Sequence, residues 1–107
     1  MAVEMPTIIR GTTPIHTFDV EIDLTTAEEI YITYRQSKSR IVEKTLEDIT
    51  VAPDKLTVRL TQADTLAFST SGEYVQIQVR VVLPGGTSMA SDILYASVSP
   101  VLKDGEI

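Results

Sequence analysis

Carboxylates at alternating positions are the first residues of this chain whose types and spacing could do chemistry. Asp19, Glu21 and Asp23 resemble the opening of a calcium-binding loop, which places ligands at its first, third and fifth positions. The register fails, because Leu24 stands where the loop needs glycine and Ile30 where it needs a bidentate glutamate. On an extended strand, alternate carboxylates stand roughly 6.6–7 Å apart, too far to close on one ion. We therefore expect a solvated strand face without a metal ion.

The single histidine, His16, is the next candidate, as a general base. Nucleophilic catalysis needs a nucleophile beside the base and a third group that orients the base. Asp19 and several serines are available, but no serine lies in a G-x-S-x-G elbow. His16 follows Pro14 at the start of an extended segment and shares a face with Phe18. We therefore expect a partly buried, hydrogen-bonded structural histidine.

Motifs for cofactor binding are missing from the sequence. The segment Pro84-Gly85-Gly86 lacks the lysine and the helix that follow a phosphate-binding loop, and it suits a tight hairpin turn. The chain contains no cysteine, which excludes disulfides, thiolate metal sites and cysteine nucleophiles. The sequence thus predicts a protein that is not an enzyme and needs no cofactor.

Charge and hydropathy narrow the classes of partner. The net charge of −6 argues against binding to nucleic acid or to an anionic membrane surface. Five carboxylates and no cation lie within residues 19–29, whereas four of the nine cations lie within residues 31–44; pairing between these segments is expected if they form neighbouring strands. No apolar run approaches the ~18 residues of a membrane span. Residues 1–6 lack the basic and apolar regions of a signal peptide, so none is expected.

Apolar and polar residues alternate along most of the chain, a pattern typical of strands with one face in a core. The clearest case is 75–81, where three valines and Ile77 point one way and the polar residues between them point the other. Turn residues separate such segments. The expected strands span residues 7–10, 16–24, 30–36, 40–45, 46–51, 55–60, 75–83 and 92–98, with helical turns at 25–29 and 61–68.

Seven or eight short strands without a long helix predict an all-β fold. We expect an antiparallel, immunoglobulin-like β-sandwich with one or two single-turn helices. Tyr74 stands where a tyrosine corner would open a strand, but it shares a face with Gln76 rather than with Val75, so the match is partial. The 107 residues suit one domain, with a flexible N-terminus at 1–5 and a C-terminal tail at 101–107.

One polar surface is not explained by core packing. Tyrosine, arginine and glutamine side chains share the outward sides of two expected strands, and these residue types are common where proteins meet. A solvated strand face is the alternative, and the pattern leaves both open. The tail also keeps apolar side chains outside any strand. The candidate interface residues are Tyr31, Arg35, Gln76, Gln78, Arg80, Leu102 and Ile107.

Several segments resemble a family of small proteins encoded in prophages and tailed phages of Gram-positive bacteria. They span nearly the whole chain: 5–14 (MPTIIRGTTP), 33–36 (TYRQ), 60–66 (LTQADTL), 75–80 (VQIQVR), 90–92 (ASD) and 101–107 (VLKDGEI). The family is similar in size and strand pattern to immunoglobulin-like modules of phage baseplate and tail proteins. It lends no catalytic residues.

The resemblance implies a non-enzymatic structural or adaptor module of a phage tail or baseplate. Its partners would be other phage structural proteins or further copies of the chain, and it would reside in the virion or, during assembly, in the host cytoplasm. One alternative is a carbohydrate- or ligand-binding module with tyrosine platforms; another is a small hydrolase or regulator of host physiology. The tyrosines considered as platforms are Tyr31, Tyr34, Tyr74 and Tyr95.

Overall fold

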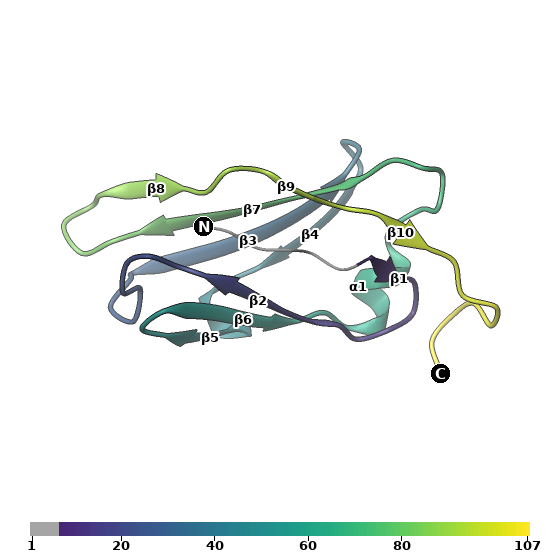
Figure 1. Ribbon diagram of the computed structural model, residues 1–107, viewed down its shortest axis with the longest axis horizontal. Coiled ribbons are helices and arrows are strands. Elements are labelled where there is room, and N and C mark those ends of the chain that lie inside the picture. Colours follow the sequence, from purple (N-terminus) through teal and green to yellow (C-terminus); the bar gives the residue numbers. More distant parts are fainter. Residues whose placement is uncertain (1–6) are drawn as a thin grey trace.

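The computed structural model describes residues 7–107, so the expectation of a flexible segment at 1–5 lies outside the described residues. This part of the chain is mostly β: ten short strands form three open sheets, joined by one short α-helix and one 3₁₀ turn. The prediction of a chain built from short strands is confirmed at this level. Figure 1 shows the three-stranded sheet lying along one side of the largest sheet.

The largest sheet is antiparallel throughout. Its order is β4-β3-β7-β8, with β9 also pairing with β7. The long central pair β3 and β7 matches the expected segments closely, because both carry uninterrupted alternation. The strands are β3 (Glu29–Gln36), β4 (Arg40–Lys44), β7 (Val75–Val82), β8 (Ser88–Ala90) and β9 (Leu94–Ala96).

Two smaller sheets complete the fold. The three-stranded sheet is antiparallel with the order β2-β6-β5, and a third sheet pairs the short strands β1 and β10 in parallel. The β1–β10 pair joins the first described strand to the last one. The strands are β1 (Ile8–Ile9), β2 (Ile15–Asp19), β5 (Ile49–Ala52), β6 (Lys55–Arg59) and β10 (Val98–Ser99).

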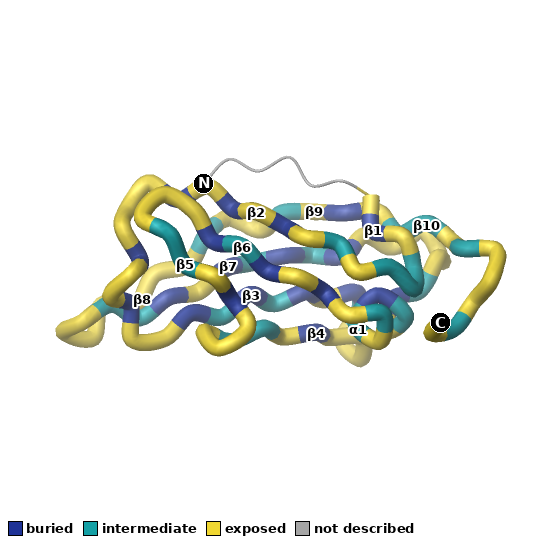
Figure 2. The backbone as a smooth tube through the Cα atoms, turned by 90° about the horizontal axis from the view of Figure 1, so that it is seen from below, coloured by how far each residue is buried: buried dark blue, intermediate teal, exposed yellow. Residues whose placement is uncertain are grey.

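Buried side chains from both larger sheets belong to one hydrophobic core cluster, and their positions follow the alternation of the sequence. On β7, Val75, Ile77, Val79 and Val81 are buried, while the residues between them are half-buried or exposed. Figure 2 shows the same alternation along β3 and β7. The remaining large, fully buried side chains come from several elements; those of greatest volume are Tyr34, Phe18, Phe68, Ile8, Ile30, Ile32, Leu56 and Leu60.

The helical turn expected at 61–68 is present as α1 (Gln62–Leu66). Its N-cap, Thr61, accepts a hydrogen bond from the Asp64 amide at 3.1 Å. The Asp64 carboxylate accepts one from the Thr61 amide at 2.8 Å, which completes a capping box. Phe68, directly after the helix, is fully buried, as expected.

The helical turn expected at 25–29 is wrong. The Asp23 carboxylate accepts hydrogen bonds from the Thr25 amide and hydroxyl, which favours a tight turn over a helix. The Glu28 amide then donates to the Val82 carbonyl at 2.8 Å, leading the chain into β3. The adjoining strand is also shorter than 16–24, because β2 ends at Asp19. Ile22, which shares the alternate positions of the buried Phe18, is exposed.

Two further expectations about the sheets need correction. The strand expected at 92–98 is divided between β9 and β10, and the sequence analysis missed β8. The acidic segment does not pair with the basic one, because β2 and β3 belong to different sheets and Asp19 instead stands opposite Lys55 of β6. Tyr74 forms no tyrosine corner: its side chain is exposed, just before β7 begins.

Candidate interaction surface

The polar side chains that the sequence analysis singled out on two strands lie together on the outward side of β3 and β7. The strands pair in antiparallel register, with Tyr31 opposite Arg80 and Arg35 opposite Gln76. Because the alternate residues of both strands are buried, these side chains emerge on the same side of the sheet. We call this set the β3–β7 face: Tyr31, Thr33, Arg35, Gln76, Gln78 and Arg80.

Hydrogen bonds hold the centre of the β3–β7 face in place. Arg35 Nη2 donates across the strands to Gln76 Oε1 at 3.2 Å. Gln78 Nε2 donates to the Ser91 carbonyl at 2.9 Å, and Ser91 Oγ accepts from the Val79 amide at 3.0 Å. These contacts reduce the side-chain entropy that a partner would otherwise have to freeze on binding.

Charged groups occupy the end of the β3–β7 face where β3 begins. The Tyr31 hydroxyl donates to Glu29 Oε1 at 2.7 Å, and this hydrogen bond raises the pKa of the Tyr31 phenol above its ordinary value. Arg80 is exposed beside them. None of the ion pairs within residues 7–107 involves Arg80, so its guanidinium is available to a carboxylate of a partner.

An aromatic and apolar margin, which the sequence analysis did not assign to the interface, extends the β3–β7 face. Tyr95 of β9 stands opposite Gln76, and its ring meets that of Tyr74 edge to face, with centroids 6.4 Å apart. Ile41 of β4 stands opposite Arg35, and all three of these apolar or aromatic side chains are more than half exposed. Tyr74 could have been found, because it lies two residues before Gln76. Tyr95 could not, because the β7–β9 pairing is non-local.

Tyr34 is not a surface platform, contrary to one alternative drawn from the sequence. It is fully buried, and its hydroxyl lies 2.7 Å from His16 Nδ1. Burial lowers the pKa of His16 below its ordinary value and raises the pKa of Tyr34. His16 is therefore a buried, hydrogen-bonded histidine, as expected. Its Nε2 has no hydrogen-bond partner among the residues that the structure describes.

The tail residues of the predicted interface lie apart from the β3–β7 face, beyond β10 (Figure 1). Leu102 and Ile107 are both exposed along almost their whole side chains. The backbone of the tail is nevertheless held: Gln62 Nε2 donates to the Ile107 carbonyl at 3.2 Å, and Gln62 Oε1 accepts from the Ile107 amide at 2.8 Å. The side-chain amide of Gln62 thus anchors the last residue to α1.

Arg10 fastens the tail at a second point. Its Nη2 lies 3.0 Å from Asp104 Oδ1, while its Nη1 donates to the Leu66 and Phe68 carbonyls at the end of α1. The Arg10 guanidinium group therefore connects the end of β1 with α1 and with the tail. The tail is consequently an ordered segment that displays apolar side chains to solvent.

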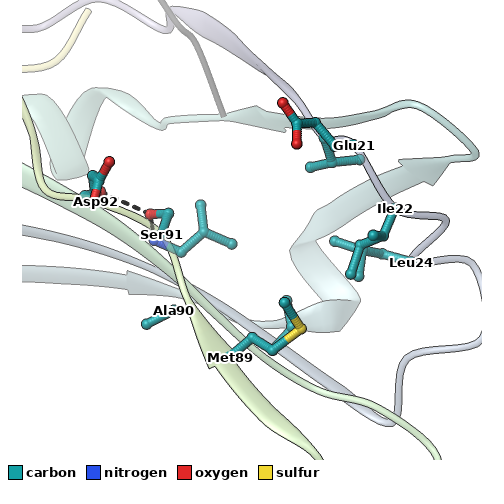
Figure 3. Close-up of a pocket in the computed structure, with 10 residues that line it drawn as sticks. Glu21, Ile22, Leu24, Met89, Ala90, Ser91 and Asp92 are labelled. Atoms are coloured by element: carbon teal, nitrogen blue, oxygen red, sulfur yellow. Dashed lines mark hydrogen bonds between the residues drawn. The ribbon is translucent and has the colours of Figure 1, made fainter.

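An apolar groove opens on the opposite half of the molecule (Figure 3). One wall is the connection after β2 and the other is β8, and the volume is about 290 Å³. Figure 3 shows Glu21 on the first wall and Asp92 beyond the second. We call it the Val79 groove after its buried floor; its apolar lining is Val20, Ile22, Leu24, Val79, Val81 and Met89.

Metal sites and membrane-spanning helices are the remaining features to consider within residues 7–107. No group of three or more histidine, cysteine, aspartate or glutamate side chains there is arranged to hold a metal ion; this includes the carboxylates of Asp19, Glu21 and Asp23. None of the helices in the same range has the length and hydropathy needed to cross a bilayer.

Comparison with family models, with curated proteins and with solved structures found no match.

Proposed function

We propose that this chain is a non-enzymatic structural or adaptor module of a phage or prophage tail or baseplate, acting by protein–protein interaction. It would belong to the virion, or to the host cytoplasm during assembly. The β3–β7 face with its tyrosine margin is the observation that carries the proposal. The sequence resemblance to small phage proteins is the reason for proposing a phage tail or baseplate.

The composition of the face supports docking of a protein. Tyrosine and arginine are among the side chains that most often dominate binding energy at protein interfaces. The face presents Arg35 and Arg80, and its margin adds Tyr74 and Tyr95 at the end near Gln76. The Arg35–Gln76 and Gln78–Ser91 hydrogen bonds hold its polar centre in place. A pre-ordered sheet face loses little side-chain entropy when a partner protein docks on it.

We further propose that the two larger sheets form an immunoglobulin-like sandwich. The orders β2-β6-β5 and β4-β3-β7 agree with the B-E-D and C′-C-F orders of variable-type immunoglobulin domains. The short helix α1 lies between β6 and β7, where the chain passes from one sheet to the other. Such a sandwich leaves the outer side of the larger sheet open to partners.

Co-purification with neighbouring virion proteins tests the function. The tagged chain is mixed with each tail and baseplate protein encoded beside it, and complexes are measured by size-exclusion chromatography with light scattering. We expect a stable complex that Arg80→Glu weakens at least tenfold. Arg59→Glu is the matched control, because Arg59 is an exposed arginine on the outer side of β6 in the other sheet. A wild-type chain that binds none of these proteins would refute the proposal.

Carbohydrate binding is the second candidate function, and the exposed pair Tyr74 and Tyr95 favours it. Their rings lie at 80° to each other, so they present both an edge and a face to solvent, and aromatic faces can stack on apolar patches of ligands. A glycan array with the wild-type chain tests this candidate. We expect any genuine signal to vanish in Tyr95→Ala and to survive in Tyr31→Ala, which lies away from the pair.

A further inference from the structure

We propose that copies of this chain associate head to tail, with the tail of one copy docked in the Val79 groove of the next. The occupant of the groove is Leu102, flanked by Lys103. This inference deepens the proposed structural function and rests on it, because it names a second copy of the chain as one partner.

The groove has the form of a receptor for one apolar side chain. Its floor consists of the core residues Val79 and Val81, which are almost fully buried. Its walls expose Ile22 and Met89, each more than 40% accessible. A volume of about 290 Å³ lies just below the range of roughly 300–1,000 Å³ typical of small-molecule sites. The groove therefore suits an inserted side chain better than a large ligand.

The tail presents a matching apolar knob. Leu102 is completely exposed and contributes nothing to the core of its own copy. The tail backbone on which it stands is held by the Arg10–Asp104 ion pair and by the Gln62–Ile107 hydrogen bonds. Because the segment is already ordered, docking Leu102 costs less conformational entropy than docking a free tail.

A local charge contact favours this occupant: of the two side-chain carboxylates in the tail, Asp104 is already paired with Arg10, which leaves Lys103 and Glu106 as the side-chain charges of the tail outside that ion pair. The rim of the groove carries Glu21 and Asp92, and the connection that forms one wall belongs to the segment 19–29, which has five carboxylates and no cation. Lys103 follows Leu102 directly, so its ammonium group reaches the rim when the leucine enters the groove. Lys103 takes part in none of the ion pairs within the described chain.

The shape of the molecule makes the contact intermolecular. The long axis measures 47 Å, and Figure 1 shows the tail at the end away from β8 and the β2–β3 connection, which form the groove. In the head-to-tail arrangement that we propose, each copy uses its tail toward one neighbour and its groove toward another, so the contact is heterologous and its repetition generates a ring or a filament. Both are forms that a structural module of a larger assembly can use.

Cysteine cross-linking of the full chain tests the geometry. The chain has no native cysteine, so the double variant Leu102→Cys/Met89→Cys carries only the designed pair. Under mild oxidation we expect a ladder of disulfide-linked multimers on a non-reducing gel. The matched control is Leu102→Cys/Thr50→Cys, because Thr50 is also exposed but lies on β5, outside both the groove and the β3–β7 face. Equal ladders from both double variants, or no ladder from either, would overturn the inference.

A mixing experiment tests the asymmetry of the contact. Leu102→Asp removes the knob and Met89→Asp removes the groove, and both side chains are exposed, so the fold should tolerate either change. Light scattering should show each variant as an 11.8 kDa monomer, whereas their mixture should form a 1:1 dimer and no larger species. Failure of the mixture to form a dimer would refute the proposal.

The two proposals fail separately. A chain that stays monomeric at millimolar concentration, yet binds virion proteins through Arg80, overturns the head-to-tail contact and leaves the proposed function standing. A chain that forms the Leu102-dependent multimers but binds no virion protein contradicts the tail or baseplate function alone. The Thr50→Asp variant, which changes an exposed residue outside the groove, the tail and the β3–β7 face, should multimerise like the wild type.

Discussion

Substitutions of His16 and Tyr34 should have strongly coupled effects on the free energy of unfolding, because the hydrogen bond between these two residues lies inside the core. Both residues are at most 2% exposed, and His16 Nδ1 lies 2.7 Å from the Tyr34 hydroxyl. If the tyrosine donates its proton to Nδ1, only the Nε2–H group of the histidine lacks a partner within the described chain. If the histidine donates, both Nε2 and the tyrosine proton lack one. The first arrangement leaves fewer polar groups unsatisfied, so we infer that Tyr34 donates.

The size of this coupling follows from which buried polar groups each substitution leaves without a hydrogen-bond partner. Tyr34→Phe keeps the ring but leaves His16 Nδ1 without a hydrogen-bond donor. An unsatisfied buried acceptor costs about 1–3 kcal/mol of stability. His16→Leu strands the Tyr34 hydroxyl at a similar cost but also removes the unpartnered Nε2. The double variant removes both partners, which by the same reasoning is close to neutral apart from packing. We therefore expect the double variant to be more stable than the sum of the single losses predicts, by about 1–2 kcal/mol.

Urea unfolding of the four proteins, followed by circular dichroism, measures this double-mutant cycle. The expected loss is readable, because a chain of this length is stable by about 5–15 kcal/mol. Thr33→Val is a suitable control with Tyr34→Phe, since Thr33 lies on the other side of β3 and its effect should simply add. Additive losses for His16→Leu and Tyr34→Phe would refute the coupling and the donor assignment with it.

Three further predictions concern stability. Burial lowers the pKa of His16, so the unfolded state binds the proton more readily, and the free energy of unfolding should fall as the pH drops below about 6.5 in the wild type but not in His16→Leu. Gln36→Met removes three hydrogen bonds to the Ser69 and Glu73 backbone and should lower the free energy of unfolding by about 3 kcal/mol in urea titrations. Desolvation raises the pKa of Asp64, but the stronger combined effect of hydrogen bonds from Lys44 and Thr61 lowers it. Lys44→Met should therefore move the midpoint of acid unfolding to higher pH, as measured by circular dichroism.

The local pattern of residues was sufficient to predict the central strands and α1. Strict alternation on 75–81 predicts both the strand and its buried side, and β7 carries it as expected. Thr61 with Asp64 three residues later is a capping box that can be read directly from the sequence. Alternation was not sufficient at 20–24, where Asp23 bonds to Thr25 instead of continuing β2. Side-chain hydrogen bonds of this kind compete with the sheet ladder and leave no period in the sequence.

The candidate surface was only partly predictable for the same reason. The period of β3 and β7 placed Tyr31, Arg35 and Gln76 on outward sides, but their register against each other is a tertiary property. The addition of Tyr95 depends on the pairing of β9 with β7, which joins segments separated along the chain. The Val79 groove is likewise a product of non-local packing, because its two walls come from opposite parts of the sequence.

By itself, the sequence determined the strand-rich character of this protein, the buried side of its main strands, the structural place of His16 and the set of polar residues at the β3–β7 face. These features follow from side-chain period and from composition, which are local quantities. Only the tertiary structure decided which strands are neighbours, that Tyr34 lies inside, and that an exposed Leu102 and an apolar groove occupy opposite ends. Those depend on contacts between distant segments, whose relative positions no local pattern encodes.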